Sequence, residues 1–129
     1  MSDLAEPTPV LRFYDEAATR AFYVDWLGFA VHFEHRFDPD APLYMGLGRG
    51  GCVLHLSQHH GDATPGAHVR VRAADVRAFH AEIGARPYAF ARPGPPDIAP
   101  WGPLELTLTD PAGNRLTFWT NPDYPPDAA

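Results

Sequence analysis

The sequence predicts an α+β fold of two βαβββ modules, because its two halves echo each other. Asp15 leads toward Arg20-Ala21-Phe22, and Asp75 leads to Arg77-Ala78-Phe79 in the same way. A second echo relates the segment that starts at Gly51 to the segment that starts at Gly113. In each half, a helical apolar stripe is followed by segments that alternate apolar and polar residues, the pattern of half-buried strands. We therefore expect a duplicated unit that forms a curved, mainly antiparallel eight-stranded sheet around a cleft.

The first module, at about residues 8–58, begins with a strand at residues 9–14. Asp15 then caps a helix that runs to about Leu27, and Gly28 supplies the left-handed residue at which a helix commonly stops. Strict alternation predicts a half-buried strand at residues 29–35. A glycine-rich turn joins the last two strands, at residues 43–47 and 51–57.

The second module, at about residues 67–120, follows a polar seam with several chain-breaking glycines and a proline. It begins with a strand at residues 67–72 and a helix that starts at Asp75. A short strand is expected at residues 88–91, before an irregular loop rich in proline. Two strands at residues 104–109 and 114–120 complete it, joined by the turn Asp110-Pro111-Ala112-Gly113.

Composition limits the classes of function. A chain of 129 residues that is 45% hydrophobic suits a single domain, residues 1–129. The net charge of -6 argues against a nucleic-acid partner, whose affinity depends on Lys and Arg. No apolar run approaches the ~20 residues needed to cross a bilayer, and we expect no membrane association. The lone Cys52 forms no internal disulfide, and without a signal-peptide pattern we expect a cytoplasmic protein.

The alternation also separates the two faces of each strand. The leucines of residues 104–109 belong to the side covered by helices, which leaves the polar residues between them on the cleft side. An antiparallel sheet commonly has one solvated face, so these positions are open to a purely structural interpretation as well. The candidate ligand-binding residues on the cleft side and its rim are His55, His68, Arg70, Trp101, Glu105, Thr107, Thr117 and Trp119.

Several motifs resemble the glyoxalase, bleomycin-resistance and extradiol-dioxygenase superfamily, also called vicinal oxygen chelate. The resemblance covers about residues 8–120, and it implies a glyoxalase-like fold without specifying a reaction. It is carried by Pro9-Val10-Leu11-Arg12-Phe13, Ala21-Phe22-Tyr23, Leu27-Gly28-Phe29, Trp101-Gly102 and the run from Asp110-Pro111-Ala112-Gly113-Asn114 to Phe118.

Enzymes of that superfamily hold a metal through one His or Glu in each of four strands. The resemblance implies that the four metal positions correspond to Thr8, His55, His68 and Thr117 in this sequence. Because a threonine hydroxyl is a poor ligand for a divalent ion, two ligands fall short of the usual three. We therefore expect no metal, no cofactor and no catalytic residue. A metal-dependent lyase, isomerase or dioxygenase that uses His55 and His68 is the alternative.

The bleomycin-resistance branch is the closest resemblance, since it is small, acidic and lacks the metal set. Its members are similar in forming a two-fold dimer whose interface grooves hold a flat, cationic glycopeptide and keep it from DNA. The resemblance implies a homodimer that binds a small molecule, with Trp101 as the stacking platform and Glu105 as a negative charge. Arginines on the same faces, Arg12, Arg70 and Arg115, would equally fit an anionic ligand. The sequence leaves open whether the modules pair within one chain or between chains.

Overall fold

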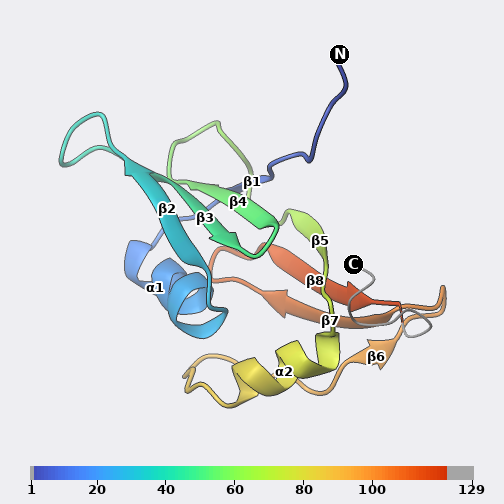
Figure 1. The fold of residues 1–129 in the computed structure, drawn as a ribbon. Coiled ribbons are helices and arrows are strands. Elements are labelled where there is room, and N and C mark those ends of the chain that lie inside the picture. The colour runs from blue at the N-terminus through green and yellow to red at the C-terminus, as the bar shows by residue number, and fades with distance from the viewer. Residues whose placement is uncertain (1, 122–129) are drawn as a thin grey trace.

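The computed structural model describes residues 2–121, which form two four-stranded sheets and two helical segments (Figure 1). The elements of the first module are β1 (Val10–Arg12), α1 (Glu16–Arg20), η1 (Ala21–Trp26), β2 (Ala30–His35), β3 (Tyr44–Arg49) and β4 (Cys52–Ser57). Those of the second are β5 (His68–Arg72), α2 (Val76–Gly84), β6 (Asp97–Ile98), β7 (Leu104–Thr109) and β8 (Arg115–Thr120).

The two sheets have the same topology, which confirms the duplication. Sheet A has the order β1-β4-β3-β2 and sheet B the order β5-β8-β7-β6. In each, the first strand of the module pairs in parallel with the last, and the other pairs are antiparallel. The order βαβββ and the α+β class are confirmed. Within one chain, however, the eight strands are divided between two separate sheets.

Both helices begin as the sequence predicts. The Asp15 carboxylate accepts a hydrogen bond of 3.1 Å from the backbone N–H of Ala18, and Asp75 caps α2 through the N–H groups of Arg77 and Ala78. These bonds satisfy donors that have no partner within the first helical turn. α1 continues without a break into the π-helix η1, and the chain turns away at Gly28, whose φ is 80°.

The predicted strand at residues 88–91 is wrong. The Tyr88 ring instead stacks on Trp26 of η1, with centroids 4.4 Å apart and planes 7° apart, so this segment packs on a helix and joins no sheet. The edge strand is β6, inside the proline-rich loop that we expected to be irregular. It is only two residues long and pairs Ile98 with Leu104. A strand can form inside this proline-rich segment because proline is tolerated at the edge of a sheet.

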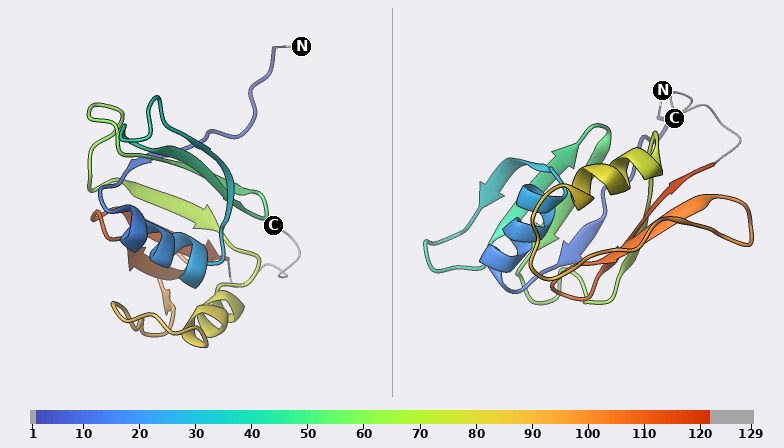
Figure 2. Two further views of the ribbon diagram at one scale, coloured as in Figure 1. Left: turned by 90° about the vertical axis from the view of Figure 1, so that its left-hand side faces the viewer. Right: turned by 90° about the horizontal axis from the view of Figure 1, so that it is seen from below.

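The inner faces of both sheets share one hydrophobic core. It contains the leucines of β7, together with residues such as Phe22, Leu54 and Phe118, all buried, as alternation predicted. Seen from below, both helices face the viewer, and α1 lies in front of the strands of sheet A (Figure 2). The polar residues of the strands are thus left on the outer faces. Within residues 2–121, no helix has both the length and the apolar character to span a membrane.

Candidate functional site: the outer faces of the two sheets

Seven of the eight predicted ligand-binding residues lie on or beside the outer face of sheet B. The register brings them together: Arg70 pairs with Thr117, which pairs with Thr107, and Trp119 pairs with Glu105 in the next row. Trp101 lies in the loop between β6 and β7. The remaining member of this group is His68, at the start of β5.

A row of side-chain hydroxyls crosses the middle of this face. Thr117 is buried, with 2% of its surface exposed. Its Oγ1 shares a hydrogen bond of 2.7 Å with Nε2 of His68 and another of 2.8 Å with Oγ1 of Thr107. These bonds fix the orientation of the imidazole, whose other nitrogen has no hydrogen bond within the described residues. The row offers a ligand both donors and acceptors on a rigid strand scaffold.

Charged and aromatic groups lie beside the hydroxyl row. Arg70 Nη2 donates a hydrogen bond of 2.6 Å to Oε2 of Glu105. The guanidinium carbon of Arg70 lies 6.0 Å from the ring centroid of Trp101 and 5.9 Å from that of Trp119. Trp101 is 68% exposed, which is unusual for so large an apolar side chain. A groove of about 530 Å³ lies between the proline-rich loop and β7, lined by residues that include Trp101, Glu105 and Thr107.

His55 is the eighth predicted residue, and it lies on the outer face of sheet A. Its Nδ1 shares a hydrogen bond of 2.8 Å with the hydroxyl of Tyr44, and its ring meets Phe33 edge-on, with centroids 5.2 Å apart. Burial raises the pKa of the Tyr44 hydroxyl, and the nearby negative charge of Asp62 adds to the shift, so Tyr44 remains a neutral phenol at pH 7.

Sequence reasoning missed Phe33 as a neighbour of this site. Its ring lies directly over Gly46, where a Cβ atom would come within 2.2 Å of the ring. Gly48 makes the same room for His32, which follows from the irregular register between β2 and β3. The glycines at alternate positions in β3 were the available signal, since a strand glycine often marks the close approach of another group.

The outer face of sheet A also holds an arginine that lacks part of its hydrogen bonding. Arg12 pairs in register with Ser57, and its guanidinium lies over the Tyr14 ring at 5.0 Å. Among the described residues, its Nη1 atom is buried and has no hydrogen-bond partner. Because an unpaired buried donor costs about 1–3 kcal/mol, this edge of sheet A favours an additional acceptor.

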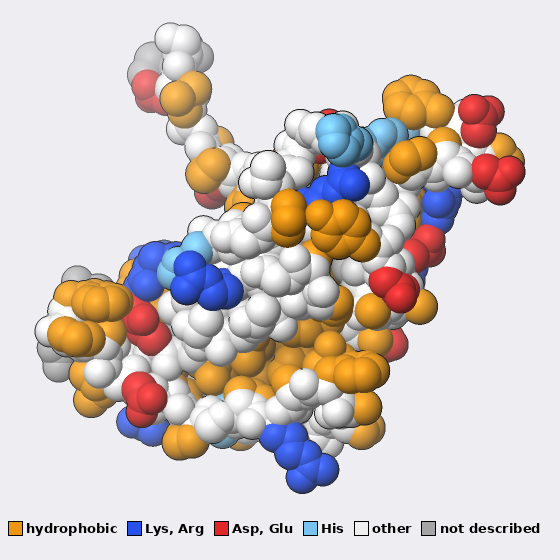
Figure 3. Space-filling model, turned by 180° about the vertical axis from the view of Figure 1, so that it is seen from behind, with side chains coloured by type: hydrophobic (Ala, Val, Ile, Leu, Met, Phe, Trp, Pro, Cys, Tyr) orange, Lys and Arg blue, Asp and Glu red, His pale blue; other side chains and the backbone are white. Residues whose placement is uncertain are grey.

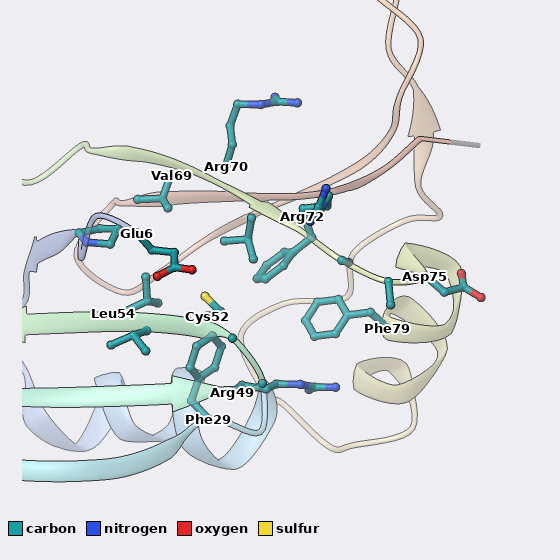
Figure 4. Close-up of a pocket in the computed structure, with 18 of the residues that line it drawn as sticks. Glu6, Phe29, Arg49, Cys52, Leu54, Val69, Arg70, Arg72, Asp75 and Phe79 are labelled. Atoms are coloured by element: carbon teal, nitrogen blue, oxygen red, sulfur yellow. The ribbon is translucent and has the colours of Figure 1, made fainter. Parts of the chain in front are cut away.

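The structure does not bring His55 into contact with the sheet B group. From behind, histidine and arginine side chains gather at two well-separated places (Figure 3). A cavity of about 870 Å³ lies between the modules and is lined by inner-face residues such as Cys52, Leu54 and Phe79. Figure 4 shows these side chains directed toward that space and Arg70 directed away from it. Burial also raises the pKa of the Cys52 thiol, which disfavours a reactive thiolate.

The residues at the superfamily's metal positions do not fit a metal. His55 and His68 each already share a hydrogen bond with a hydroxyl group. Thr117 supplies only a neutral oxygen, and Thr8 is exposed before β1. Across residues 2–121, no group of three or more His, Cys, Asp or Glu side chains is placed to hold an ion.

Comparison with solved structures finds the same fold in bleomycin-binding and bleomycin-resistance proteins. A bleomycin-binding protein in complex with bleomycin is 27% identical, with 92% of this chain and 99% of that chain covered and a TM-score of 0.65. A bleomycin resistance determinant encoded on transposon Tn5 is 28% identical over 92% and 99% of the two chains, with a TM-score of 0.69. The copper(II)-bleomycin complex of the Streptomyces verticillus protein is 29% identical over 92% and 97%, with a TM-score of 0.66.

No curated protein sequence matches this chain. A family model described as "Glyoxalase superfamily protein" matches residues 3–124, which is nearly the whole sequence. The match agrees with the duplicated βαβββ topology and with the motifs that the sequence carries. The chain therefore belongs to the glyoxalase superfamily.

Proposed function

We propose that this protein binds a small organic molecule and sequesters an antibiotic of the bleomycin type. The observation that carries the proposal is the exposed indole of Trp101 beside a groove that contains Glu105 and Thr107. A flat ring that stacks on this indole would have the Glu105 carboxylate and the threonine hydroxyls within reach. The three structural relatives described above, which are bleomycin-binding or bleomycin-resistance proteins, support the choice of ligand.

We further propose that the working form is a homodimer in which the sheet A face of one chain lies against the sheet B face of its partner. The two polar groups lie on the outer faces of different sheets, so neither chain alone encloses a ligand. The sheet A face also exposes apolar side chains that a partner would cover: Val10, Phe33 and Val53 are 36%, 43% and 37% exposed. Symmetric pairing of this kind is the commonest form of homo-oligomer.

In this arrangement the protein acts without catalysis. Each groove would be completed by His55, Tyr44 and Phe33 of one chain facing the Trp101 side of the other. Aromatic surfaces would hold the flat part of the ligand, and the carboxylate and hydroxyl groups would orient its polar part. Because bleomycin-type drugs act on DNA, we place this sequestration in the cytoplasm. The metal-enzyme alternative is weakened by the hydroxyl partners of His55 and His68 and by the threonines at the other two metal positions.

A DNA-cleavage assay tests the proposal. Purified protein added in excess over iron-loaded bleomycin should protect plasmid DNA from strand breaks. Trp101→Ala should protect less at the same concentration. Phe90→Ala removes an aromatic side chain that is at least as exposed and does not line the groove, and it should protect fully. Equal cleavage with and without the wild-type protein would refute the bleomycin version of the proposal.

A further inference from the structure

The side chain of Arg70 occupies a position that a cationic ligand would take. Its guanidinium lies near two indoles, Trp101 and Trp119, and forms an ion pair with Glu105. Aromatic faces and a carboxylate are the groups that recognise a planar cation with parallel N–H donors. The protein's own guanidinium thus fills a small cation site, which we call the indole cage, formed by Trp101, Trp119 and Glu105.

The strand register explains how the indole cage forms. Trp119 of β8 and Glu105 of β7 are direct partners across sheet B, and they lie in the same row as Arg72 rather than Arg70. Arg70 therefore reaches diagonally from the preceding row to place its guanidinium there. Trp101 approaches from the loop, where Gly102 has a φ of 117° that few other residues adopt. The cage is built from groups that do not depend on Arg70 for their backbone positions.

Exposure indicates that Arg70, rather than Glu105, is the partner that can leave the ion pair. Its side chain is 40% exposed and is carried by the edge strand β5, whereas the Glu105 side chain is only 15% exposed. A long arginine side chain on an edge strand can swing into water, where its charge is well solvated, and an ion pair this exposed contributes little to stability. The shielded carboxylate, in contrast, benefits from any cation that replaces the departing guanidinium.

We propose that the indole cage binds a guanidinium, amidinium or similar planar cation of the ligand, and that Arg70 is an internal competitor that the ligand must displace. This inference rests on the proposed small-molecule function and specifies the chemical class of group that enters the groove. Because Arg70 competes with the ligand, the apparent affinity equals the intrinsic affinity multiplied by the fraction of time in which the indole cage is vacant. Arg70 is thereby a specificity-determining residue that admits cations able to outcompete a guanidinium.

The opposite role for Arg70 makes the opposite prediction. If Arg70 stayed in place and paired with a ligand carboxylate, its removal would abolish binding of anions and give cations no advantage. A planar aromatic pair that differs only in charge separates these two roles. Benzamidine carries an amidinium group on a phenyl ring, and benzoate carries a carboxylate on the same ring.

The test is a tryptophan-fluorescence titration of the full chain with benzamidine and, separately, with benzoate. Arg70→Ala should bind benzamidine about tenfold more tightly than the wild type, a change that corresponds to a cage occupied by Arg70 about nine-tenths of the time. Arg70→Met, which keeps the apolar stem, should give the same gain. Arg77→Ala removes the same charge from the exposed surface of α2 and should leave the affinity within about twofold, since screening weakens distant charges.

Adding Glu105→Gln to Arg70→Ala should remove the gain, because the cage then lacks its carboxylate. No gain with either Arg70 variant, or an equal gain with Arg77→Ala, would overturn the proposal, as would benzoate binding that is lost with Arg70. Titration with bleomycin separates this result from the proposed function. If Trp101→Ala weakens bleomycin binding while the Arg70 variants leave the benzamidine affinity unchanged, only the indole-cage proposal is refuted.

Discussion

Tyr23 donates a hydrogen bond of 2.6 Å from its hydroxyl to Oδ2 of Asp110, and thereby links the two modules across 87 residues of sequence. The same carboxylate accepts from the backbone and side-chain N–H groups of Asn114, whose amide also donates to the carbonyl oxygen of Arg12 in β1. Tyr23 and Asn114 are completely buried. The turn Asp110-Pro111-Ala112-Gly113-Asn114, a superfamily marker in the sequence, therefore holds the helix and first strand of the other module.

Tyr23→Phe should destabilise the protein by about 1.5–3 kcal/mol, the usual contribution of a hydrogen bond to a charged group. Burial, followed by the charge of Asp110, raises the pKa of Tyr23 well above its ordinary value, so the hydroxyl remains a donor across the working pH range. Urea unfolding followed by circular dichroism measures the loss. Tyr14→Phe removes a hydroxyl from a 54% exposed ring and is the matched control. Equal midpoints for the two variants would contradict this role.

Glu82 should make stability depend on pH. The Arg49 guanidinium bonds both of its carboxylate oxygens, at 2.9 and 2.7 Å, and this contact lowers the pKa of Glu82. Since the folded pKa lies below the unfolded value, the stabilisation is complete above about pH 4.5 and is lost as the pH falls through the folded pKa.

Glu82→Gln should therefore cost about 1 kcal/mol at pH 7, a modest figure because the pair is partly solvated, and the cost should shrink below pH 4. Thermal unfolding of both proteins between pH 3 and 7 measures the difference. Glu6→Gln, at an exposed carboxylate with no ion pair among the described residues, serves as the control. A cost that stays constant down to pH 3 would exclude ionisation of Glu82 as its cause.

The dimer proposal predicts a two-chain species in sedimentation velocity at micromolar concentration. Val53→Asp should shift it to the monomer, because the change places a charge on the outer face of sheet A that the partner would cover. Phe90→Asp, at a residue that is 78% exposed and lies outside both sheets, should leave the dimer intact. A monomer for the wild-type protein would refute the proposed arrangement.

The protein purified through metal-free buffer should contain well below one equivalent of zinc, nickel, iron or manganese. Two histidines and two neutral threonines do not make up the three ligands that a catalytic ion needs. Elemental analysis by mass spectrometry checks the content. A stoichiometric metal that is lost in His55→Ala would restore the enzyme alternative.

Much of the fold was predictable because local chemistry determines it. Asp15 and Asp75 cap their helices, Gly28 ends the first one, and the leucines of β7 enter the core as alternation requires. The predicted strand at residues 88–91 is wrong because the Tyr88 ring stacks on Trp26, a tertiary contact that no local sequence pattern encodes. The two sheets could not be distinguished from one, since period-two alternation does not reveal which strand edges meet.

The candidate site was predictable in composition but not in arrangement. Alternation placed Glu105, Thr107 and Thr117 on one face, and the structure keeps them together. The position of Arg70 between two indoles depends on the β5–β8 register and on a loop conformation, neither of which the residue types determine. Within one chain the fold sets His55 and His68 on different sheets, so their predicted common cleft requires the outer faces of two chains.

Isothermal calorimetry with bleomycin tests the central claim, that Trp101 is the stacking surface of a drug-binding groove, most directly. We expect saturable binding by the wild-type protein at one ligand per chain, since a symmetric dimer has two equivalent grooves. Trp101→Ala should weaken binding by about tenfold, equivalent to 1.4 kcal/mol for one good aromatic contact, while Phe90→Ala should not. Absence of heat at high micromolar ligand, or unchanged affinity in Trp101→Ala, would contradict it.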